Sequence, residues 1–348
     1  MTRASRMLHR RKPEWATPLA GVDVLLADLD GVVYKGSAAI PLAVESLNRA
    51  AETIRVGYIT NNASRTDQSV ADHLTQLGLS VAAADVVTSP QAAVRLLAEH
   101  VEPGASILVI GGDGLVDEVV KAGFVVTRSA DDKPAAVIQG FAPEIGWVHL
   151  AEAAFALNAD GVGTGIPWIA TNTDWTIPVA RGIAPGNGTL VSAVHTAVGR
   201  LPLVAGKPEA AIFLEATRRF NARNALFIGD RLDTDILGAN RAGIPAVLVL
   251  TGIDRAKQAL AADKESRPTF IIENLQQLHE PYPETVFSKD GSTATVNGAS
   301  VRITGNDVQI VKDGDGGINL LRAACAAIYR SGRAIYGLNV PERLYLAQ

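Results

Sequence analysis

Short apolar runs alternate with longer amphipathic stretches between about residue 22 and residue 278. Each apolar run is rich in leucine or β-branched residues and ends in a turn signal, a pattern that predicts strands. These runs are VDVLLADLD, IRVGYITNN, SILVIGG, AAVIQGF, PWIATNTD, NALFIGD and IPAVLVLTG. The stretches PEAAIFLEATRRF and DILGANRAG have helical spacing, and Arg241 followed by Gly243 is typical of a helix end. Helices that alternate with continuously apolar strands predict parallel α/β sheets.

The length of chain between Thr60 and Lys207 equals that of a whole domain. Residues 101–200 also contain strand and helix patterns of their own. We therefore expect a core formed by residues 15–100 and 201–280, with residues 101–200 inserted into it as a second α/β domain.

The pattern changes after about residue 280. STATVNGASVRIT and DVQIV predict a β-hairpin, and NLLRAACAAIYRSG predicts a helix. We expect a small C-terminal extension at 283–348 that is too short for an ordinary core of its own and packs on the rest. KDGDGG lacks the closing glutamate of a calcium loop, so we interpret it as a hairpin turn.

Composition narrows the possible partners and compartment. The 348 residues are 47% hydrophobic and carry a net charge of -4, with no basic stripe for nucleic acid. No apolar run is long enough to span a bilayer, and the basic RMLHRRK near the N-terminus is not followed by the apolar segment of a signal peptide. The single Cys325 excludes an internal disulfide, and its alanine- and leucine-rich surroundings predict a buried, inert thiol. We expect a cytoplasmic protein that binds neither nucleic acid nor membranes.

Four polar segments follow predicted strands or lie at strand-to-loop junctions. They are DLDG (28–31), TNN (60–62), GKP (206–208) and GDRLDTD (229–235). Each alone is a weak signal, because such residues are common at turns. Open α/β sheets bind ligands at the edge formed by the carboxyl ends of their strands, so we expect the four segments to meet there.

Together these segments resemble the four motifs of the haloacid dehalogenase-like (HAD) phosphatase superfamily. The long insertion between the second and third motifs resembles its type IIA capped branch, which contains phosphoglycolate, pyridoxal-phosphate and nitrophenyl-phosphate phosphatases. GGDGLVDEV and IATNTDWTIPVARGIAPGNG resemble the cap signatures of that branch. The resemblance covers about residues 20–278 and implies a Rossmann-like parallel-sheet core with an inserted α/β cap.

The chemistry of a phosphomonoester fits these residue types. The ester is an anion, so a carboxylate nucleophile needs a cation and fixed positive charge beside it. Mg²⁺ prefers oxygen ligands and is bound through one or two carboxylates plus a substrate phosphate. Asp28 and Asp230 can supply those carboxylates, and the resemblance implies the backbone carbonyl of Asp30 as a third ligand. The four segments contain no His or Cys, which argues against zinc.

We expect Asp28 to attack phosphorus and form an aspartyl-phosphate. Asp30 would protonate the leaving alkoxide and then deprotonate the attacking water, and nearby carboxylates should raise its pKa. Thr60 Oγ and the Asn61 amide would donate to the phosphoryl oxygens, and Lys207 would neutralise charge. This predicts Asp28, Asp30, Thr60 and Lys207 as the catalytic residues.

Other residues are predicted to bind substrate or to support the site. Asp235 would orient Lys207 or a metal-bound water. A cap would exclude water and recognise the leaving group, and the loop around Asn172 and Asp174 is the best candidate for that recognition. QGFAPEIGW replaces the usual GFD- or GLD-type segment of the branch. The complete substrate-binding prediction is Gly31, Thr60, Asn61, Asn62, Asn172, Asp174 and Lys207.

Aromatic residues of the insert give a weaker signal. Trp147, Trp168 and Trp175 are interpreted as packing residues, with a substrate-facing Trp175 as the alternative. We interpret His195, which lies within a helical apolar pattern, as structural.

These observations predict a Mg²⁺-dependent phosphomonoesterase acting on a small phosphate ester. Chain length and the C-terminal tail resemble actinobacterial members of the branch, which favours glycerol 3-phosphate over phosphoglycolate and pyridoxal phosphate. Caps of this branch often mediate dimers, so the resemblance implies a homodimer through the cap. The alternatives from other classes are a phosphorylated receiver-type signalling module and a binding protein on an inactive core. Catalytic turnover separates both from an enzyme.

Overall fold

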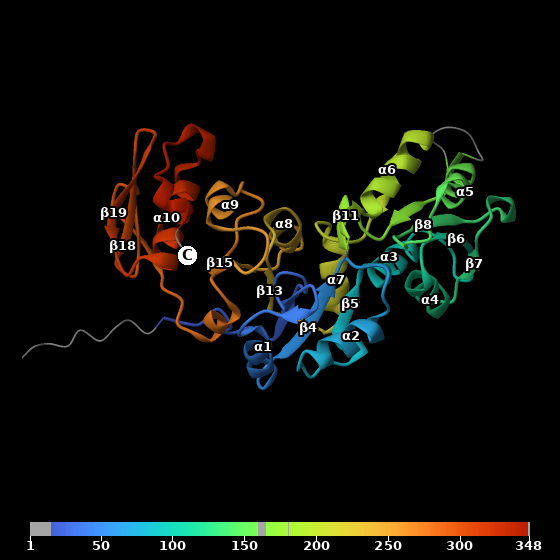
Figure 1. The fold of residues 1–348 in the computed structure, drawn as a ribbon, viewed down its shortest axis with the longest axis horizontal. Helices are drawn as coiled ribbons and strands as arrows, with labels where there is room; N and C mark the ends of the chain where they lie inside the picture. The colour runs from blue at the N-terminus through green and yellow to red at the C-terminus, as the bar shows by residue number, and fades with distance from the viewer. Residues whose placement is uncertain (1–14, 159–164, 180, 347–348) are drawn as a thin grey trace, which may run out of the picture. The chain divides into compact units, whose positions relative to one another are not determined.

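The computed structural model describes residues 15–158, 165–179 and 181–346. The chain divides into two compact units, one formed by Gly21–Leu275 and the other by Met1–Ala20 with Gln276–Gln348. Figure 1 shows the elements of both units along the chain. The first unit contains two parallel sheets, and all four polar segments belong to it.

The larger sheet has six parallel strands in the order β15-β14-β13-β1-β4-β5. Its central strand β1 pairs with β13 on one side and with β4 on the other, so that Ala27 lies opposite both Ile228 and Tyr58. The buried runs Val-Leu-Leu-Ala of β1 and Ala-Val-Leu-Val of β14 explain why these segments form central strands. The strands are β1 Val24–Ala27, β4 Arg55–Thr60, β5 Val86–Thr88, β13 Ala225–Gly229, β14 Ala246–Val249 and β15 Phe270–Ile272.

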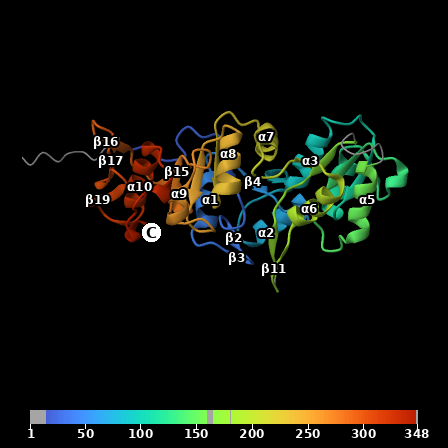
Figure 2. The same cartoon turned by 90° about the horizontal axis from the view of Figure 1, so that it is seen from above.

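Helices cover both faces of this sheet. In Figure 2, α3 (Ser89–Leu97), α7 (Ala210–Arg219) and α8 (Leu237–Arg241) lie along one side and α1 (Ala43–Ala51) and α2 (Asp67–Gln76) along the other. Helix α7 buries Ile212, Phe213 and Ala216, and the Phe213 ring meets Phe227 of β13 edge-on with 4.9 Å between centroids. As predicted, α8 has Arg241 in its last turn, and Gly243 follows with φ +72°.

The remaining elements around this sheet have these bounds: α1 Ala43–Ala51, α2 Asp67–Gln76, α3 Ser89–Leu97, α7 Ala210–Arg219, α8 Leu237–Arg241, α9 Ala256–Ala261, β2 Tyr34–Lys35, β3 Ala38–Ala39, a 3₁₀ turn at Ala83–Asp85 and a π turn at Leu232–Ile236.

The inserted segment forms a second parallel sheet in the order β12-β9-β8-β6-β7. Helices α5 and α6 pack on it over a separate apolar core that includes Leu108, Val137, Leu157 and Val191. The sheet takes in β12, a few residues past position 200. Its elements are β6 Ser106–Ile110, α4 Asp113–Lys121, β7 Val125–Thr127, a 3₁₀ turn at Ala130–Asp132, β8 Ala136–Gln139, α5 Trp147–Asn158, β9 Trp168–Ala170, the hairpin β10 Thr176–Val179 with β11 Gly182–Pro185, α6 Asn187–Val198 and β12 Leu203–Val204.

The tryptophans of the insert behave differently from one another. Trp168 is buried and donates its ring N–H to Gln139 Oε1 at 3.2 Å, as expected of a packing residue. Trp147 and Trp175 are 78% and 66% exposed. The prediction that all three are packing residues was therefore wrong for these two, because a sequence pattern does not show which face of an element is covered.

The second unit has a four-stranded antiparallel sheet, β16-β17-β18-β19, with α10 packed on β17 and β18. Cys325 of α10 is buried, as predicted, and burial raises the pKa of its thiol to about 12. The KDGDGG segment joins β19 to α10, so its interpretation as a hairpin turn was wrong. The elements are β16 Thr285–Phe287, β17 Thr293–Val296, β18 Ala299–Thr304, β19 Asp307–Asp313, α10 Gly317–Ser331 and 3₁₀ turns at Leu275–His279, Ile335–Gly337 and Glu342–Tyr345.

The second unit also has an apolar interior of its own, contrary to the expectation that the tail is too short for one. Val296, Val301, Leu321 and Leu344 are all fully buried. Among the described residues, no helix is long and apolar enough to cross a membrane.

Candidate active site

Three neighbouring strands end beside one another and bring the first, second and fourth motifs together. Asp28 directly follows β1, Thr60 is the last residue of β4, and Asp230 directly follows β13. The backbone N–H of Asp28 continues the sheet ladder by donating to the carbonyl of Ile228 at 2.9 Å. The sheet register therefore places these three residues at one edge, as the sequence predicts.

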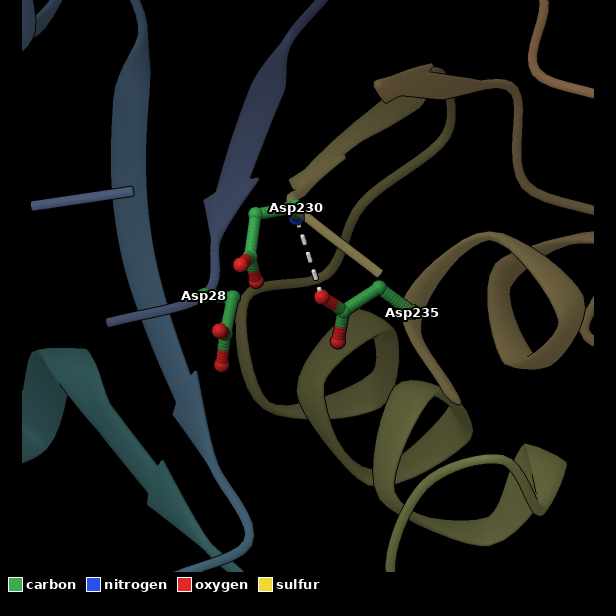
Figure 3. Close-up of side chains that lie close together, drawn as sticks. All are labelled: Asp28, Asp230 and Asp235. Carbon is green, nitrogen blue, oxygen red and sulfur yellow. Dashed lines mark hydrogen bonds between the residues drawn. The ribbon is translucent and has the colours of Figure 1, made fainter. Parts of the chain in front are cut away.

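Three carboxylates converge at this edge (Figure 3). Side-chain oxygens of Asp28, Asp230 and Asp235 lie within 4.8 Å of one another. Lys207 Nζ reaches the same point, donating to Asp28 Oδ1 and, at 2.7 Å, to Asp235 Oδ1. None of these four residues is more than 8% exposed. The third motif thus supplies a buried cation to the aspartates of the first and fourth.

The charges in this cluster do not balance. Burial raises the pKa of Asp28 well above its usual range, since Lys207 offsets the burial only in part and Asp235 and Asp230 add repulsion. Burial and the charge of Asp235 raise the pKa of Asp230 to about 7. Burial also works against the charge of Lys207, but Asp235 and Asp28 overcome it and raise the lysine pKa. Three ionised carboxylates beside one ammonium leave two excess negative charges, which fits a divalent cation with oxygen ligands.

The two oxygens of Asp235 are already bound by protein donors. Its Oδ1 accepts from Lys207, and its Oδ2 accepts from the backbone N–H groups of Asp230 at 3.1 Å and Arg231 at 3.2 Å. The nearby Asp233 is exposed and pairs with Arg231 at 2.8 Å. Asp28 and Asp230 are consequently the carboxylates best able to face an ion, and Asp235 lies where it can orient Lys207.

Gly31 makes room for this arrangement. Its φ is +80°, and a Cβ at this position would lie 2.3 Å from Asp230 Oδ2. A side chain there would both strain the backbone and displace the carboxylate. Gly31 is therefore required for the shape of the site, beyond any contact with substrate.

Asp30 lies outside the buried cluster, and its side chain is exposed. Desolvation by the surrounding protein nevertheless raises its pKa, while Lys207, Arg65 and His73 oppose that shift. A raised pKa at an accessible carboxyl suits a group that must both give and take a proton.

Asn61 connects the core to the inserted domain. Its Nδ2 donates to Asp174 Oδ1 and to the Lys207 carbonyl, both at 3.1 Å, and its Oδ1 accepts from Lys207 N at 2.8 Å. Asn172 Nδ2 donates to the Asn61 carbonyl at 2.8 Å, as does Ser89 Oγ at 2.6 Å. Both hydrogens of the Asn61 side-chain amide are thus engaged in holding Lys207 and the cap loop.

The other predicted substrate residues have local roles in the structure. The buried Thr60 hydroxyl accepts from Asn62 N at 3.2 Å, and the exposed Asn62 accepts from Ser64 N at 2.9 Å, so both shape the turn after β4. In the cap loop, Asn172 Oδ1 accepts from Asp174 N at 3.2 Å. Burial raises the pKa of Asp174, and its bond from Asn61 opposes this.

Sequence reasoning missed a segment that lies at the same edge. Thr251–Asp254 follows β14 and bonds to Gly31 and Asp230. The available signal was its position, because it directly follows the buried run IPAVLVL of a central strand.

Comparison with known proteins decides the family. Residues 25–125 match the haloacid dehalogenase-like hydrolase family and residues 204–278 match the HAD-like hydrolase family. D-glycerol 3-phosphate phosphatase of Mycobacterium tuberculosis is 43% identical over 314 residues, covering 90% of this chain and 87% of that protein. The chain belongs to the haloacid dehalogenase-like hydrolases. The prediction of a phosphatase of this superfamily with a Rossmann-like core is confirmed.

Solved structures agree with this HAD assignment. A glycerol phosphate phosphatase from M. tuberculosis in complex with magnesium has a TM-score of 0.82 at 40% identity, covering 95% of this chain and 97% of that one. A p-nitrophenyl phosphatase from Archaeoglobus fulgidus has a TM-score of 0.68 at 26% identity, covering 74% of this chain and 98% of that one.

Proposed function

We propose that this HAD hydrolase is a Mg²⁺-dependent phosphomonoesterase that hydrolyses glycerol 3-phosphate through an aspartyl-phosphate on Asp28. The observation that carries the proposal is the buried cluster of Asp28, Asp230, Asp235 and Lys207. Its excess negative charge is costly without a cation. A receiver domain needs no acid–base residue such as Asp30, and an inactive core needs no such cluster.

The first step transfers the phosphoryl group to the enzyme. An oxygen of Asp28 forms a bond to phosphorus while the bond from phosphorus to the glycerol oxygen breaks, and Asp30 gives its proton to that oxygen. In the second step water attacks phosphorus, Asp30 takes the proton of the water, and the bond between phosphorus and Asp28 breaks. Phosphate leaves and both aspartates return to their starting states.

Charge compensation comes from Lys207 and from the metal. Lys207 contacts Asp28 and so favours the ionised form that can attack. Asp28, Asp230 and the backbone carbonyl of Asp30 would hold Mg²⁺, which when bound supplies positive charge to the carboxylates and the phosphoryl oxygens. Asp235 keeps Lys207 in place through its 2.7 Å bond.

Thr60, Gly31 and Asn62 are proposed as donors to the phosphoryl oxygens. Thr60 lies at the end of β4, beside the strand that leads to Asp28. Its buried hydroxyl has one O–H group with which it can donate a hydrogen bond. Gly31 and Asn62 would contribute from the two adjacent loops. Asn61, Asn172 and Asp174 would shape the leaving-group side through the network that joins cap and core.

A groove of about 480 Å³ along α2 supports a polar leaving group. One of its lining residues, His73, meets the Tyr34 ring edge-on with 5.1 Å between centroids, and Tyr34 forms an isolated β-bridge with Asp30, so the groove lies near the proposed acid–base residue. Polar side chains suit the hydroxyls of glycerol better than the ring of pyridoxal. The lining is formed by Arg65, Thr66, Gln68, Ser69, Asp72, His73 and Gln76.

Arg65 of this groove favours phosphoglycolate as a second candidate substrate, because the leaving group of phosphoglycolate carries a carboxylate. The experiment is phosphate release from glycerol 3-phosphate, phosphoglycolate, pyridoxal phosphate and nitrophenyl phosphate, each with and without Mg²⁺. Metal-dependent kcat/KM highest for glycerol 3-phosphate supports the proposal. Equal rates with and without Mg²⁺, or no turnover of any ester, would contradict it.

Assembly and location are proposed as well. Helix α5 exposes Trp147 (78%), Val148 (64%) and Phe155 (60%), and we propose that the cap forms a homodimer through such residues. Trp147→Glu should shift the mass measured by light scattering from dimer to monomer, while exposed Glu144→Gln should not.

We also propose a cytoplasmic location. A single buried cysteine that forms no internal disulfide is the cysteine usage expected of a cytoplasmic protein.

A further inference from the structure

The segment Thr251–Asp254, which follows β14, bonds to two loops of the proposed active site. On one side, Thr251 Oγ1 donates to the Gly31 carbonyl at 2.6 Å. On the other side, Ile253 N donates to Asp230 Oδ2 at 2.6 Å, and Asp254 N donates to the Asp230 carbonyl at 3.1 Å. One short segment therefore ties the loop after β1 to the loop after β13.

The Thr251 bond fixes a peptide unit next to a proposed metal ligand. Gly31 donates its N–H to the Tyr34 carbonyl at 2.9 Å, and its own carbonyl accepts from Thr251. A peptide unit is planar and trans, so the direction of the Gly31 N–H also sets the direction of the Asp30 carbonyl. With φ of +80°, Gly31 is otherwise free to rotate more than other residues. Thr251 removes that freedom.

The rest of the segment fixes Asp230 and the turn that carries Asp235. A Cβ on Gly252 would lie 1.8 Å from Asp230 Oδ2, so the carboxylate packs directly against this backbone. Asp254 Oδ2 accepts from Leu232 N at 2.6 Å, at the start of the π turn Leu232–Ile236. Asp254 thus holds the first turn of the segment that presents Asp235 to Lys207.

We propose that Thr251 and Asp254 are positioning residues that pre-form the Mg²⁺ site from both sides. The inference rests on the proposed function, because the ligands they position are those proposed for the metal. Neither residue is required to touch substrate. Residues that orient metal ligands typically contribute about 10- to 100-fold in metal affinity or activity.

The test uses the full chain and Mg²⁺ alone as the probe. Isothermal titration of the protein with Mg²⁺, without ester, is compared for wild type, Thr251→Val and Thr251→Ser. We expect Thr251→Val to weaken Mg²⁺ binding about 10-fold, and Thr251→Ser, which keeps the hydroxyl, to stay within about 2-fold of wild type. Thr269→Val is the matched control, because Thr269 Oγ1 accepts from Ala246 N at 3.3 Å at the opposite end of β14.

Kinetics give a second signature of positioning. For Thr251→Val, kcat should fall at limiting Mg²⁺ and recover toward wild type as Mg²⁺ is raised, with the KM for ester unchanged at saturating Mg²⁺. A general loss of structure would not be corrected by the metal. Asp254→Ala should behave like Thr251→Val, whereas Asp254→Asn keeps an acceptor for Leu232 and should retain near-wild-type binding.

The outcomes separate the two proposals. If wild type binds Mg²⁺ and Thr251→Val and Asp254→Ala bind it equally well, the positioning role is wrong and the proposed function stands. If wild type binds Mg²⁺ with the expected variant pattern but hydrolyses no ester, the positioning role stands and the proposed function fails. If wild type binds no Mg²⁺, both are overturned. The Asp254 pair decides the question if Thr251→Val does not fold.

Discussion

The core edge and the cap loop both present polar side chains between the same two domains, but their environments differ. At the core edge, Asp28 and Asp230 are buried with more negative charge than Lys207 balances. In the cap loop, Asn172 and Asp174 bond to Asn61 and to each other, so their hydrogen-bonding capacity is largely used. Excess buried charge indicates a site that needs a ligand, whereas satisfied polar groups indicate a site that holds shape.

The strongest test of this comparison replaces one carboxylate at the core edge and one carboxylate in the cap loop by the matching amide. Asp28→Asn removes the proposed nucleophile and should lower kcat about 10⁴-fold or more. Asp174→Asn keeps an acceptor for Asn61 and should change kcat/KM less than about 10-fold. Phosphate release at saturating Mg²⁺ measures both, with circular dichroism to show that each variant is folded. Equal losses of activity in the two variants would contradict the idea that the core edge carries the chemistry and the cap loop only maintains the shape of the site.

Adding a side chain in the space beside Asp230 should have the next largest effect on activity. Gly252→Ala forces a Cβ into Asp230, so the carboxylate must move. A displacement of about 1 Å at a reacting centre can lower the rate about 10²-fold, and we expect a kcat loss of that order. Gly146→Ala in the insert is the control, because a Cβ there has nothing within 4 Å. Wild-type kcat in Gly252→Ala would show that the site tolerates movement of Asp230.

The pH dependence of stability should reveal the unbalanced charge. The pKa of Asp230 is about 7 when folded and about 4 when unfolded, so the folded state holds the extra proton between these values. The metal-free protein should therefore lose stability as pH rises from about 4 to 7, and the raised pKa of Asp28 acts in the same direction.

Mg²⁺ should reverse that loss, because it binds the ionised carboxylates. We expect the rise in Tm on adding Mg²⁺ to be larger at pH 8 than at pH 5, with about 2.7 kcal/mol gained at 100 times Kd. Thermal unfolding at both pH values, with and without Mg²⁺, measures this. Asp230→Asn should remove most of the difference, and an unchanged response in that variant would exclude Asp230 as its source.

The smallest effect is expected in the cap loop. Asn172→Ala removes the donor to the Asn61 carbonyl and the acceptor for Asp174 N. It should lower the free energy of unfolding by about 1–3 kcal/mol and alter kcat less than about 10-fold. Denaturant unfolding and steady-state kinetics measure the two effects. Asn48→Ala, which loses a solvent-exposed bond to the Gly78 carbonyl, is the control. A kcat loss approaching that of Asp28→Asn would give Asn172 a catalytic role.

The core edge could be predicted because local patterns point to it directly. A buried apolar strand followed by DLDG or GD places Asp28 and Asp230 at strand ends, and parallel pairing then brings those ends together. The cap residues were located on the correct loop, but the use of the Asn61 side chain could not be foreseen. It depends on contacts between residues 113 and 146 positions apart.

In the C-terminal unit, too, local sequence patterns predicted the elements but not how they pack together. Its strands and helix follow from alternation and helical spacing, so their existence was predicted. Its separate core was not, because burial of Val301 and Leu321 depends on α10 packing across the sheet.

By itself, the sequence determined the α/β class, the order of the elements, the aspartates at the strand ends and the HAD family resemblance, because periodicity and motif spacing are local properties. Only the tertiary structure decided which polar groups are satisfied and which are not. It showed that Asn61 bonds to Lys207 and to Asp174 of the cap loop, and that Thr251 and Asp254 bond to the loops after β1 and β13. Hydrogen bonding and desolvation depend on what surrounds a group in space, and that is set by strands and loops distant in the chain.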